Sequence, residues 1–271
     1  MFQNMIDDLS YNLYSLNMHP YFNISNFILI SLLTKDTFRK DNISFIKSHP
    51  LANYILTMIL SFAGSIIINF LYGDSLILIL QNPTGLFHAS IIWYLIHYCP
   101  GDIAYKLCNI LPIFTIICVM KELQRCKNIF SGIDEAVVRF PGSYLVWIVA
   151  GTMKGSSTNQ ATVILELFLK SGSLMRNEMM FPSHVTKMSF LISCAYLMKG
   201  MFSNYFTVQI LFMSAVLVLT YFRLLIIFSG ASNPFRKIEI ILSFVLFGGL
   251  ADQISQSFWQ KSMATETKKT K

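Results

Sequence analysis

The stretch KELQRCKN at residues 121–128 combines several cations with one carboxylate, directly after an apolar run. Lys121 and Arg125 are four residues apart, so on a helix they share one face, and Glu122 lies roughly 100° away from them. The guanidinium fork of arginine suits two phosphate oxygens, and lysine adds a point charge. This pattern predicts an anion clamp for a phosphorylated lipid head group. The alternative is an interfacial pair that attracts any anionic lipid.

The composition of the chain decides whether these charges belong to a membrane protein. Of its 271 residues, 54% are hydrophobic and 13% are charged, and the mean hydropathy is +0.54. A soluble domain would carry about 25% charged residues. The run YFTVQILFMSAVLVLTYFRLLIIF at residues 205–228 also exceeds the length of about 20 residues that a helix needs to cross a bilayer. We therefore expect an all-α membrane protein with no nucleic-acid partner.

Seven apolar segments are expected to cross the membrane. They comprise residues 21–34, 51–72, 86–99, 103–120, 144–169, 185–198 and 205–228. A shorter run at residues 240–251 is expected to form an interfacial or partly buried helix, and the basic tail to be solvated. The expected organisation is an N-terminal segment (1–20), two three-helix repeats (21–99 and 103–198), a seventh helix (205–228) and a C-terminal segment (229–271).

The two sets of three spans share one arrangement, because the middle span of each is the longest and contains glycine near its centre. Three crossings make the second copy inverted, and such folds place their polar path where the two middle helices break. We therefore expect two inverted three-helix repeats plus a seventh helix. For Gly64 alone, close helix packing is the alternative interpretation. The residues expected at the breaks and along the path are Gly64, Ser65, Gly151, Lys154, Gly155, Ser156, Ser157 and Thr158.

The distribution of lysine and arginine predicts a luminal N-terminus and a cytosolic C-terminus, because the segments that would then face the cytosol contain most of these residues. Lys268 and Lys269 near the C-terminus have the form of a dilysine retrieval signal for the endoplasmic reticulum. Asp102, in CPGD, is expected to cap the next helix, with attraction of cations to a pore mouth as the alternative.

The sequence shows no pattern typical of a metal site or of an enzyme. The five cysteines form no C-x-x-C pair, and the histidines are scattered. Neither H-E-x-x-H nor G-x-S-x-G occurs, and paired carboxylates are missing. We therefore expect no metal cofactor and no enzymatic activity.

Several motifs in series resemble the trimeric intracellular cation (TRIC) channel family, most closely its type B members. KELQRCKNI is similar to the family pattern K-E-x-x-R-x-x-K-I, and the resemblance extends from about His19 to Gly249. The accompanying motifs, in order, are WYLIHYCPGDIAYK, GTMKGSS, NEMMFPSHVTK and PFRKIEIILSFVLFGG. Two departures are Asn128, where the family has its last lysine, and Ser157, where glycine is frequent in the family.

The resemblance implies seven helices, a homotrimer in the endoplasmic or sarcoplasmic reticulum, and a hydrophilic pore inside each protomer. It also implies a bound phosphoinositide, such as phosphatidylinositol bisphosphate, and a potassium counter-current during calcium release. The residues themselves leave a secondary transporter as the alternative, since inverted repeats with broken helices are typical of that class. A transporter would need acidic or polar ligands for a coupling ion at mid-membrane, where the central charge here is the basic Lys154.

Overall fold

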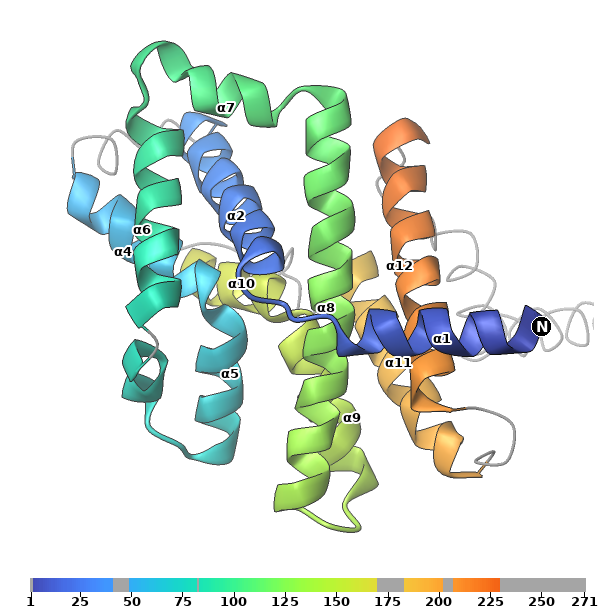
Figure 1. Cartoon of the computed structure of the whole chain (residues 1–271). Coiled ribbons are helices and arrows are strands. Elements are labelled where there is room, and N and C mark those ends of the chain that lie inside the picture. The colour runs from blue at the N-terminus through green and yellow to red at the C-terminus, as the bar shows by residue number, and fades with distance from the viewer. Residues whose placement is uncertain (1, 41–48, 82, 170–182, 202–206, 230–271) are drawn as a thin grey trace, which may run out of the picture. The chain divides into compact units, whose positions relative to one another are not determined.

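The computed structural model of the chain describes residues 2–40, 49–81, 83–169, 183–201 and 207–229, and throughout these ranges it contains helices and no strand (Figure 1). All the elements belong to one compact unit, Met1–Gly230. In chain order they are α1 (Phe2–Ser15), α2 (Tyr21–Lys40), α4 (Pro50–Ser61), α5 (Ala63–Tyr72), the 3-10 helix η1 (Leu76–Gln81), α6 (Pro83–Tyr98), the 3-10 helix η2 (Pro100–Asp102), α7 (Ile103–Cys108), α8 (Leu111–Arg139), α9 (Tyr144–Gly155), α10 (Ser157–Leu169), α11 (His184–Met201) and α12 (Val208–Ser229).

Each of the seven apolar segments corresponds to a helix or to a pair of helices, with bounds that differ by a few residues in most cases. Helix α2, which corresponds to the first apolar segment, continues beyond that segment to Lys40. The expected helix at residues 240–251, the basic tail and the dilysine pair lie outside the described residues.

The fourth segment differs most from the expectation. It forms the short helix α7 and the long helix α8, which meet at a bend of 61°. The two helices meet before Pro112, which occupies the first turn of α8, where proline is tolerated. Helix α8 then continues to Arg139, so KELQRCKN lies within a helix and not at its end. Burial explains the continuation, because Cys126, Ile129 and Ile133 are completely buried beyond the apolar run.

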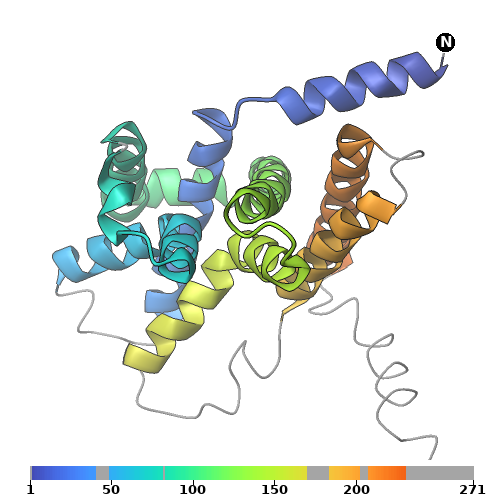
Figure 2. The ribbon, with the colours of Figure 1, turned by 90° about the horizontal axis from the view of Figure 1, so that it is seen from below.

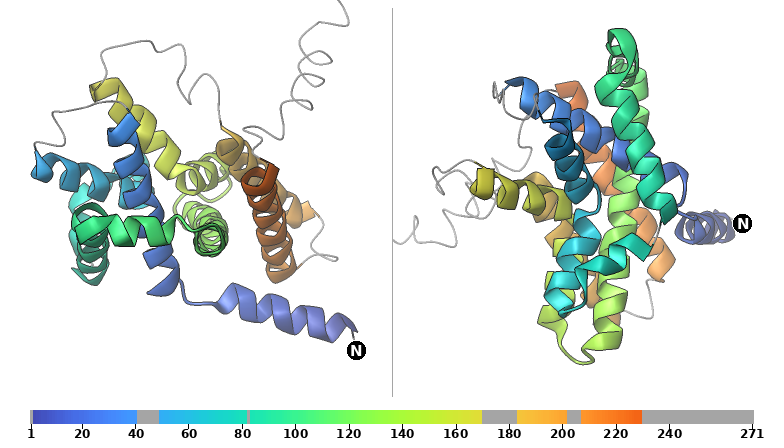
Figure 3. Two further views of the ribbon diagram at one scale, coloured as in Figure 1. Left: turned by 90° about the horizontal axis from the view of Figure 1, so that it is seen from above. Right: turned by 90° about the vertical axis from the view of Figure 1, so that its left-hand side faces the viewer.

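Helix α8 lies at the centre of the described bundle. The group α2, α4, α5 and α6 packs on one side of it and the pair α11 and α12 on the other, with α9 alongside (Figures 1 and 2). Helix α7 crosses from α6 to α8 at one end, and α1 lies across α12 (Figure 3). Small residues permit close packing in this core, as in the cluster of Ile68, Ala136 and Ala150, which joins α5, α8 and α9.

The second and fifth spans are both broken, as the sequence predicted. Helices α4 and α5 meet at a 65° bend at Phe62, and helices α9 and α10 meet at Ser156. The backbone is nearly identical at the two positions, with φ −105° and ψ 13° at Phe62 and φ −102° and ψ 11° at Ser156. One residue in the sparsely populated bridge region therefore interrupts each helix.

By length and composition, α12 is the one described helix that could cross a bilayer alone. Two bent pairs, α4 with α5 and the segment Pro100–Cys108 with α8, also qualify if each pair is taken as one span. Most of the other helices are too short to cross a bilayer alone, and α2, which has 20 residues, ends in the charged stretch TKDTFRK.

Candidate functional site

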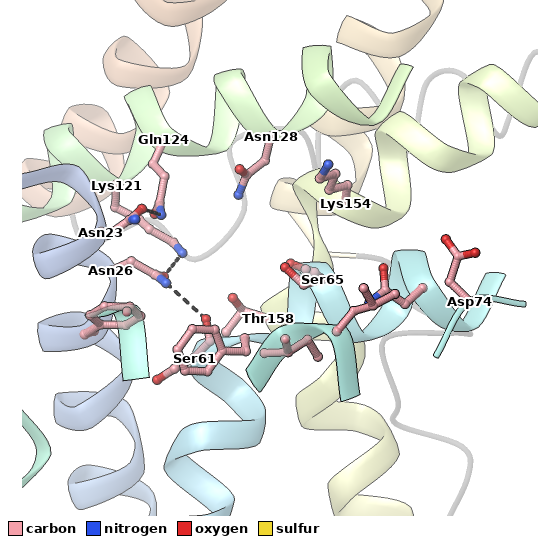
Figure 4. Close-up of a pocket in the computed structure, with 18 of the residues that line it drawn as sticks. Asn23, Asn26, Ser61, Ser65, Asp74, Lys121, Gln124, Asn128, Lys154 and Thr158 are labelled. Atoms are coloured by element: carbon pink, nitrogen blue, oxygen red, sulfur yellow. Dashed lines mark hydrogen bonds between the residues drawn. The ribbon is translucent and has the colours of Figure 1, made fainter. Parts of the chain in front are cut away.

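A cavity of about 460 Å³ lies between α2, the break of α4 and α5, the central helix α8, and the break of α9 and α10 (Figure 4). Both helix breaks therefore contribute to one space. Most of the side chains around it are polar but uncharged. The polar and glycine residues that line it are Asn23, Asn26, Ser61, Gly64, Ser65, Asn69, Asp74, Gly85, Lys121, Gln124, Asn128, Arg139, Lys154, Ser157 and Thr158.

One face of α8 forms a wall of this cavity. Lys121, Gln124, Asn128 and Arg139 line it, and their spacing places them on the same side of a helix. With a rise of about 1.5 Å per residue, the stretch from Lys121 to Arg139 is roughly 27 Å long, close to the thickness of about 30 Å of a bilayer's hydrocarbon core. A polar path along this face could thus extend across most of a membrane.

Lys121 is connected to the first helix break through Asn26. The Lys121 ammonium donates to Asn26 Oδ1, and Asn26 Nδ2 donates over 3.3 Å to the carbonyl of Ser61 (Figure 4). Ser61 is the last residue of α4, where helix carbonyls lack partners within their own helix. Beside this chain of bonds, Gln124 Nε2 donates to Asn23 Oδ1 over 2.8 Å. Amide side chains thus join α2 to α8 across the cavity.

Arg125 is arranged differently from the expected clamp. Its guanidinium is ion-paired with Glu122. Arg125 is not among the described residues that line the cavity. The expectation that Glu122 points away from the clamp is wrong, because one helical turn brings its carboxylate to Arg125. The Glu122 side chain is only 2% exposed, and its Oε1 lies 4.0 Å from Arg223 Nε on α12. Lys121 and Arg125 therefore contact different partners.

Lys127 and Asn128 point in different directions. Lys127 Nζ donates over 2.6 Å to the carbonyl of Tyr14 and lies 4.3 Å from the centre of the Tyr14 ring. Its charge thus stabilises the C-terminal end of α1, where cations interact favourably with the helix dipole. Asn128 lines the cavity instead. At this turn of α8 the cavity is therefore lined by a neutral amide.

The residues expected at the second break divide into two groups. Lys154, Ser157 and Thr158 line the cavity, as do Gly64 and Ser65 of the second span, whereas Gly151, Gly155 and Ser156 do not. Two of these three are packing glycines that allow α9 to approach α8 and α11. A Cβ atom at Gly155 would lie 2.3 Å from Ile129 Cγ1, and one at Gly151 would lie 2.6 Å from Ile133 Cγ1.

Lys154 has an acidic partner that the sequence did not reveal. Its Nζ lies 2.5 Å from Oε1 of Glu135, one turn before Arg139 on α8. With the Arg125–Glu122 pair, this contact gives two of the three cations Lys121, Arg125 and Lys154 an acidic partner. The third, Lys121, donates to the neutral amide of Asn26.

Asp102 also has another role than the one expected. It has a left-handed backbone, with φ 56°, and its side chain makes no capping bond to α7. Its carboxylate lies instead 2.7 Å from Lys35 Nζ, which also donates to the carbonyl of Ile96. The pair ties the C-terminal part of α2 to the turn before α7. Asp102 does not cap α7, because its carboxylate is paired with Lys35, which is far away in the sequence.

Sequence reasoning did not identify Asn23, Asn26, Gln124 or Asp74 as lining residues. A weak signal existed, because Asn23 and Asn26 are three residues apart and so share a helix face within the apolar segment at residues 21–34. Among the residues described, no cluster of three or more His, Cys, Asp or Glu side chains could hold a metal ion. The chemistry of the site is that of a mainly polar cavity with scattered, mostly paired charges.

The sequence of the chain is similar to those of proteins of one family. The model of a family described as TRIC channel matches residues 39–230. The chain is 30% identical over 244 residues to trimeric intracellular cation channel type 1B.2 of Caenorhabditis elegans, covering 89% of this chain and 78% of the relative. It is 28% identical over 232 residues to human trimeric intracellular cation channel type A, covering 85% and 77%.

Solved structures show the same fold. A trimeric intracellular cation channel from C. elegans, determined in the absence of Ca²⁺, superposes with a TM-score of 0.74 at 29% identity, covering 83% of this chain and 97% of that one. A structure described as the structural basis for activity of TRIC counter-ion channels in calcium release superposes with a TM-score of 0.76 at 22% identity, covering 83% and 99%.

Proposed function

Because the chain belongs to the TRIC channel family, whose members are ion channels and not enzymes, we propose that it conducts monovalent cations, chiefly potassium, as a counter-current during calcium release. The observation that carries this proposal is the cavity where two broken helices meet beside a polar face of α8. Its lining offers oxygen and nitrogen dipoles rather than a cluster of acidic ligands. Such a lining suits passage of a monovalent ion better than tight binding of a coupling ion.

The proposed architecture is seven transmembrane helices, arranged as two inverted three-helix repeats plus the seventh helix α12. The matching dihedral angles at Phe62 and Ser156 support the repeat, since each is the interruption of the middle span of its set. The proposed assembly is a homotrimer in the membrane of the endoplasmic or sarcoplasmic reticulum, with a luminal N-terminus and a cytosolic C-terminus. We also propose a separate pore in each protomer, because both helix breaks and α8 of the same chain line the cavity.

The proposed lipid ligand is a phosphoinositide head group that binds beside Lys121 and Arg125. The charges around Glu122 support an anionic ligand, because this single buried carboxylate lies near two guanidinium groups, Arg125 and Arg223. Lys121, one turn before Arg125, donates to the neutral amide of Asn26. A cation at membrane depth costs about 2.5–3.5 kcal/mol to insert, so a phosphate close to this group of cations would be strongly stabilising.

Recordings from the purified protein in planar bilayers test the channel function. We expect stepwise currents in a potassium chloride gradient that reverse near the equilibrium potential of potassium. Smooth fluxes that depend on a second solute would favour the alternative, a secondary transporter with inverted repeats. The matched variants are Asn128→Lys, which adds a cation to the cavity, and Lys127→Gln, which changes a side chain on the α1 side. Asn128→Lys should lower the single-channel conductance, and Lys127→Gln should leave it unchanged.

Native mass spectrometry tests the lipid proposal. Arg125→Ala alone would leave the buried Glu122 with only its longer contact to Arg223 and should cost up to about 3–5 kcal/mol of stability. The informative variants are therefore Lys121→Ala and the double change Glu122→Gln with Arg125→Gln. Both should lose a stoichiometric phosphoinositide that the wild type retains. Retention by both variants would contradict the lipid site while leaving the channel proposal intact.

A further inference from the structure

An ion pair crosses one end of the cavity, and the proposed cation path along α8 assigns no role to this pair. Arg139 Nη2 lies 2.6 Å from Asp74 Oδ2, and both residues line the cavity. Arg139 is the last residue of α8, and Asp74 lies in the turn after α5. The pair therefore joins the two walls of the cavity at the opposite end from Lys121 and Asn26, the end at which Figure 4 shows Asp74.

The carboxylate of this pair is placed by the backbone around it. Gly73 ends α5 with a left-handed conformation, φ 72°, and the Asp74 amide donates over 2.8 Å to the carbonyl of Asn69. This glycine-based end fixes the turn that presents Asp74 to the cavity. Asp74 is thus the stationary partner.

The guanidinium of Arg139, in contrast, lies at the end of a long side chain with several rotatable bonds. Its guanidinium carbon lies 4.7 Å from the centre of the Tyr72 ring, in addition to the contact with Asp74. The side chains of Arg139 and Asp74 are 45% and 28% exposed. Ion pairs exposed to this degree contribute little net stability and are weakened by salt, so this one can open at low cost. The Arg125–Glu122 pair, at 12% and 2% exposure, lacks this property.

We propose that the Asp74–Arg139 pair controls access of cations to this end of the cavity, and that Asp74 is the residue that attracts them. With the pair closed, the guanidinium lies in the path and cancels the carboxylate. With the pair open, the fixed carboxylate faces incoming cations and raises their local concentration. This inference rests on the proposed channel function and adds a conductance-determining residue to it.

The test is single-channel recording at low ionic strength with four proteins. Arg139→Gln removes the covering charge and should raise the potassium conductance, whereas Asp74→Asn leaves an uncovered cation and should lower it. One unit charge about 4 Å away in water changes the local cation concentration by about fivefold, which sets the scale of both effects. Both should shrink at high salt. The double variant Asp74→Asn with Arg139→Gln should lie between the two.

The matched control is the second ion pair between the end of a helix and a turn, Lys35 with Asp102, which does not line the cavity among the residues described. Lys35→Gln should leave the single-channel conductance at the wild-type value. Equal losses of conductance in Arg139→Gln and Asp74→Asn, or wild-type conductance in both, would overturn the proposal. Wild-type protein without stepwise currents would instead overturn the channel function itself, so the two failures can be told apart.

Discussion

The two broken spans have the same backbone geometry in different surroundings. At the first break Phe62 packs its ring against Phe27, with ring centroids 5.6 Å apart. At the second break Ser156 is 1% exposed, and its hydroxyl donates over 2.7 Å to the carbonyl of Thr152. One break is therefore held mainly by an aromatic contact, and the other by a local hydrogen bond.

The glycines near the breaks have a role other than bending the helix. Neither interrupting residue is glycine, and both have negative φ values that any residue can adopt. Gly155 and Gly151 instead leave room for Ile129 and Ile133, and a Cβ at Gly64 would lie 3.3 Å from Ser157 Oγ. The difference between the regions shows that one bend geometry can arise from different local sequences. Tertiary packing, more than conformational freedom, places these glycines.

The largest effect is expected from adding a methyl group at the second break. Gly155→Ala would bring a Cβ to 2.3 Å from Ile129 Cγ1 and 2.9 Å from Ser189 Oγ, so α9 would have to move. Overpacking of this kind costs about 1–3 kcal/mol of the free energy of unfolding. Gly64→Ala is the matched change at the first break and should stay within about 0.5 kcal/mol, because its nearest contact is 3.3 Å. Thermal unfolding of the purified protein in detergent measures both, and equal losses would show that the two glycines act alike.

A smaller effect should follow from truncating the interrupting residues themselves. Phe62→Ala removes part of the cluster around Phe27 and Met58 and should cost about 1 kcal/mol, since the ring is only partly buried. Ser156→Ala should cost less, because the Thr152 carbonyl still accepts the Ser156 amide over 3.0 Å. Chemical denaturation compares the two. A larger loss for Ser156→Ala would mean that the hydroxyl, and not packing, maintains the bend.

The smallest effect on stability is expected from cysteines that report access to water at the second break. Thr158 lines the cavity, whereas Ser156 is buried beside it. In a background without reactive native cysteines, a water-soluble thiol reagent should modify Thr158→Cys readily and Ser156→Cys slowly. Labelling rates by mass spectrometry decide this, with Ser65→Cys as the equivalent reporter at the first break. Equal rates at residues 156 and 158 would place the polar path elsewhere.

Much of the fold could be predicted from the sequence, because its signals are local. Apolar runs of membrane length indicate helices whatever surrounds them, and the polar string after Gly151 indicates a break in the fifth span. The end of the fourth span could not be found in this way. Polar residues from Lys121 onward suggested that the membrane segment had ended, but distant helices bury the other faces of α8 and it continues to Arg139.

The candidate site was predicted in part. Lys154, Ser157 and Thr158 were identified from the polar string, and Lys121 from its motif, and all four line the cavity. Asp74 was not identified, because a single aspartate after a glycine is typical of any turn. Only the fold brings it next to Arg139, which comes from another helix.

The sequence by itself determined the class of the molecule, the positions of its broken helices and the presence of cations in the interior of the bundle. Only the tertiary structure decided what each cation contacts. Lys121 meets Asn26, 95 residues earlier, Arg125 meets Glu122 within its own helix, and Lys154 meets Glu135 on the neighbouring helix. The physical reason is that hydrophobicity and helix periodicity are properties of adjacent residues, whereas an ion pair depends on which helices the fold brings within a few ångströms of one another.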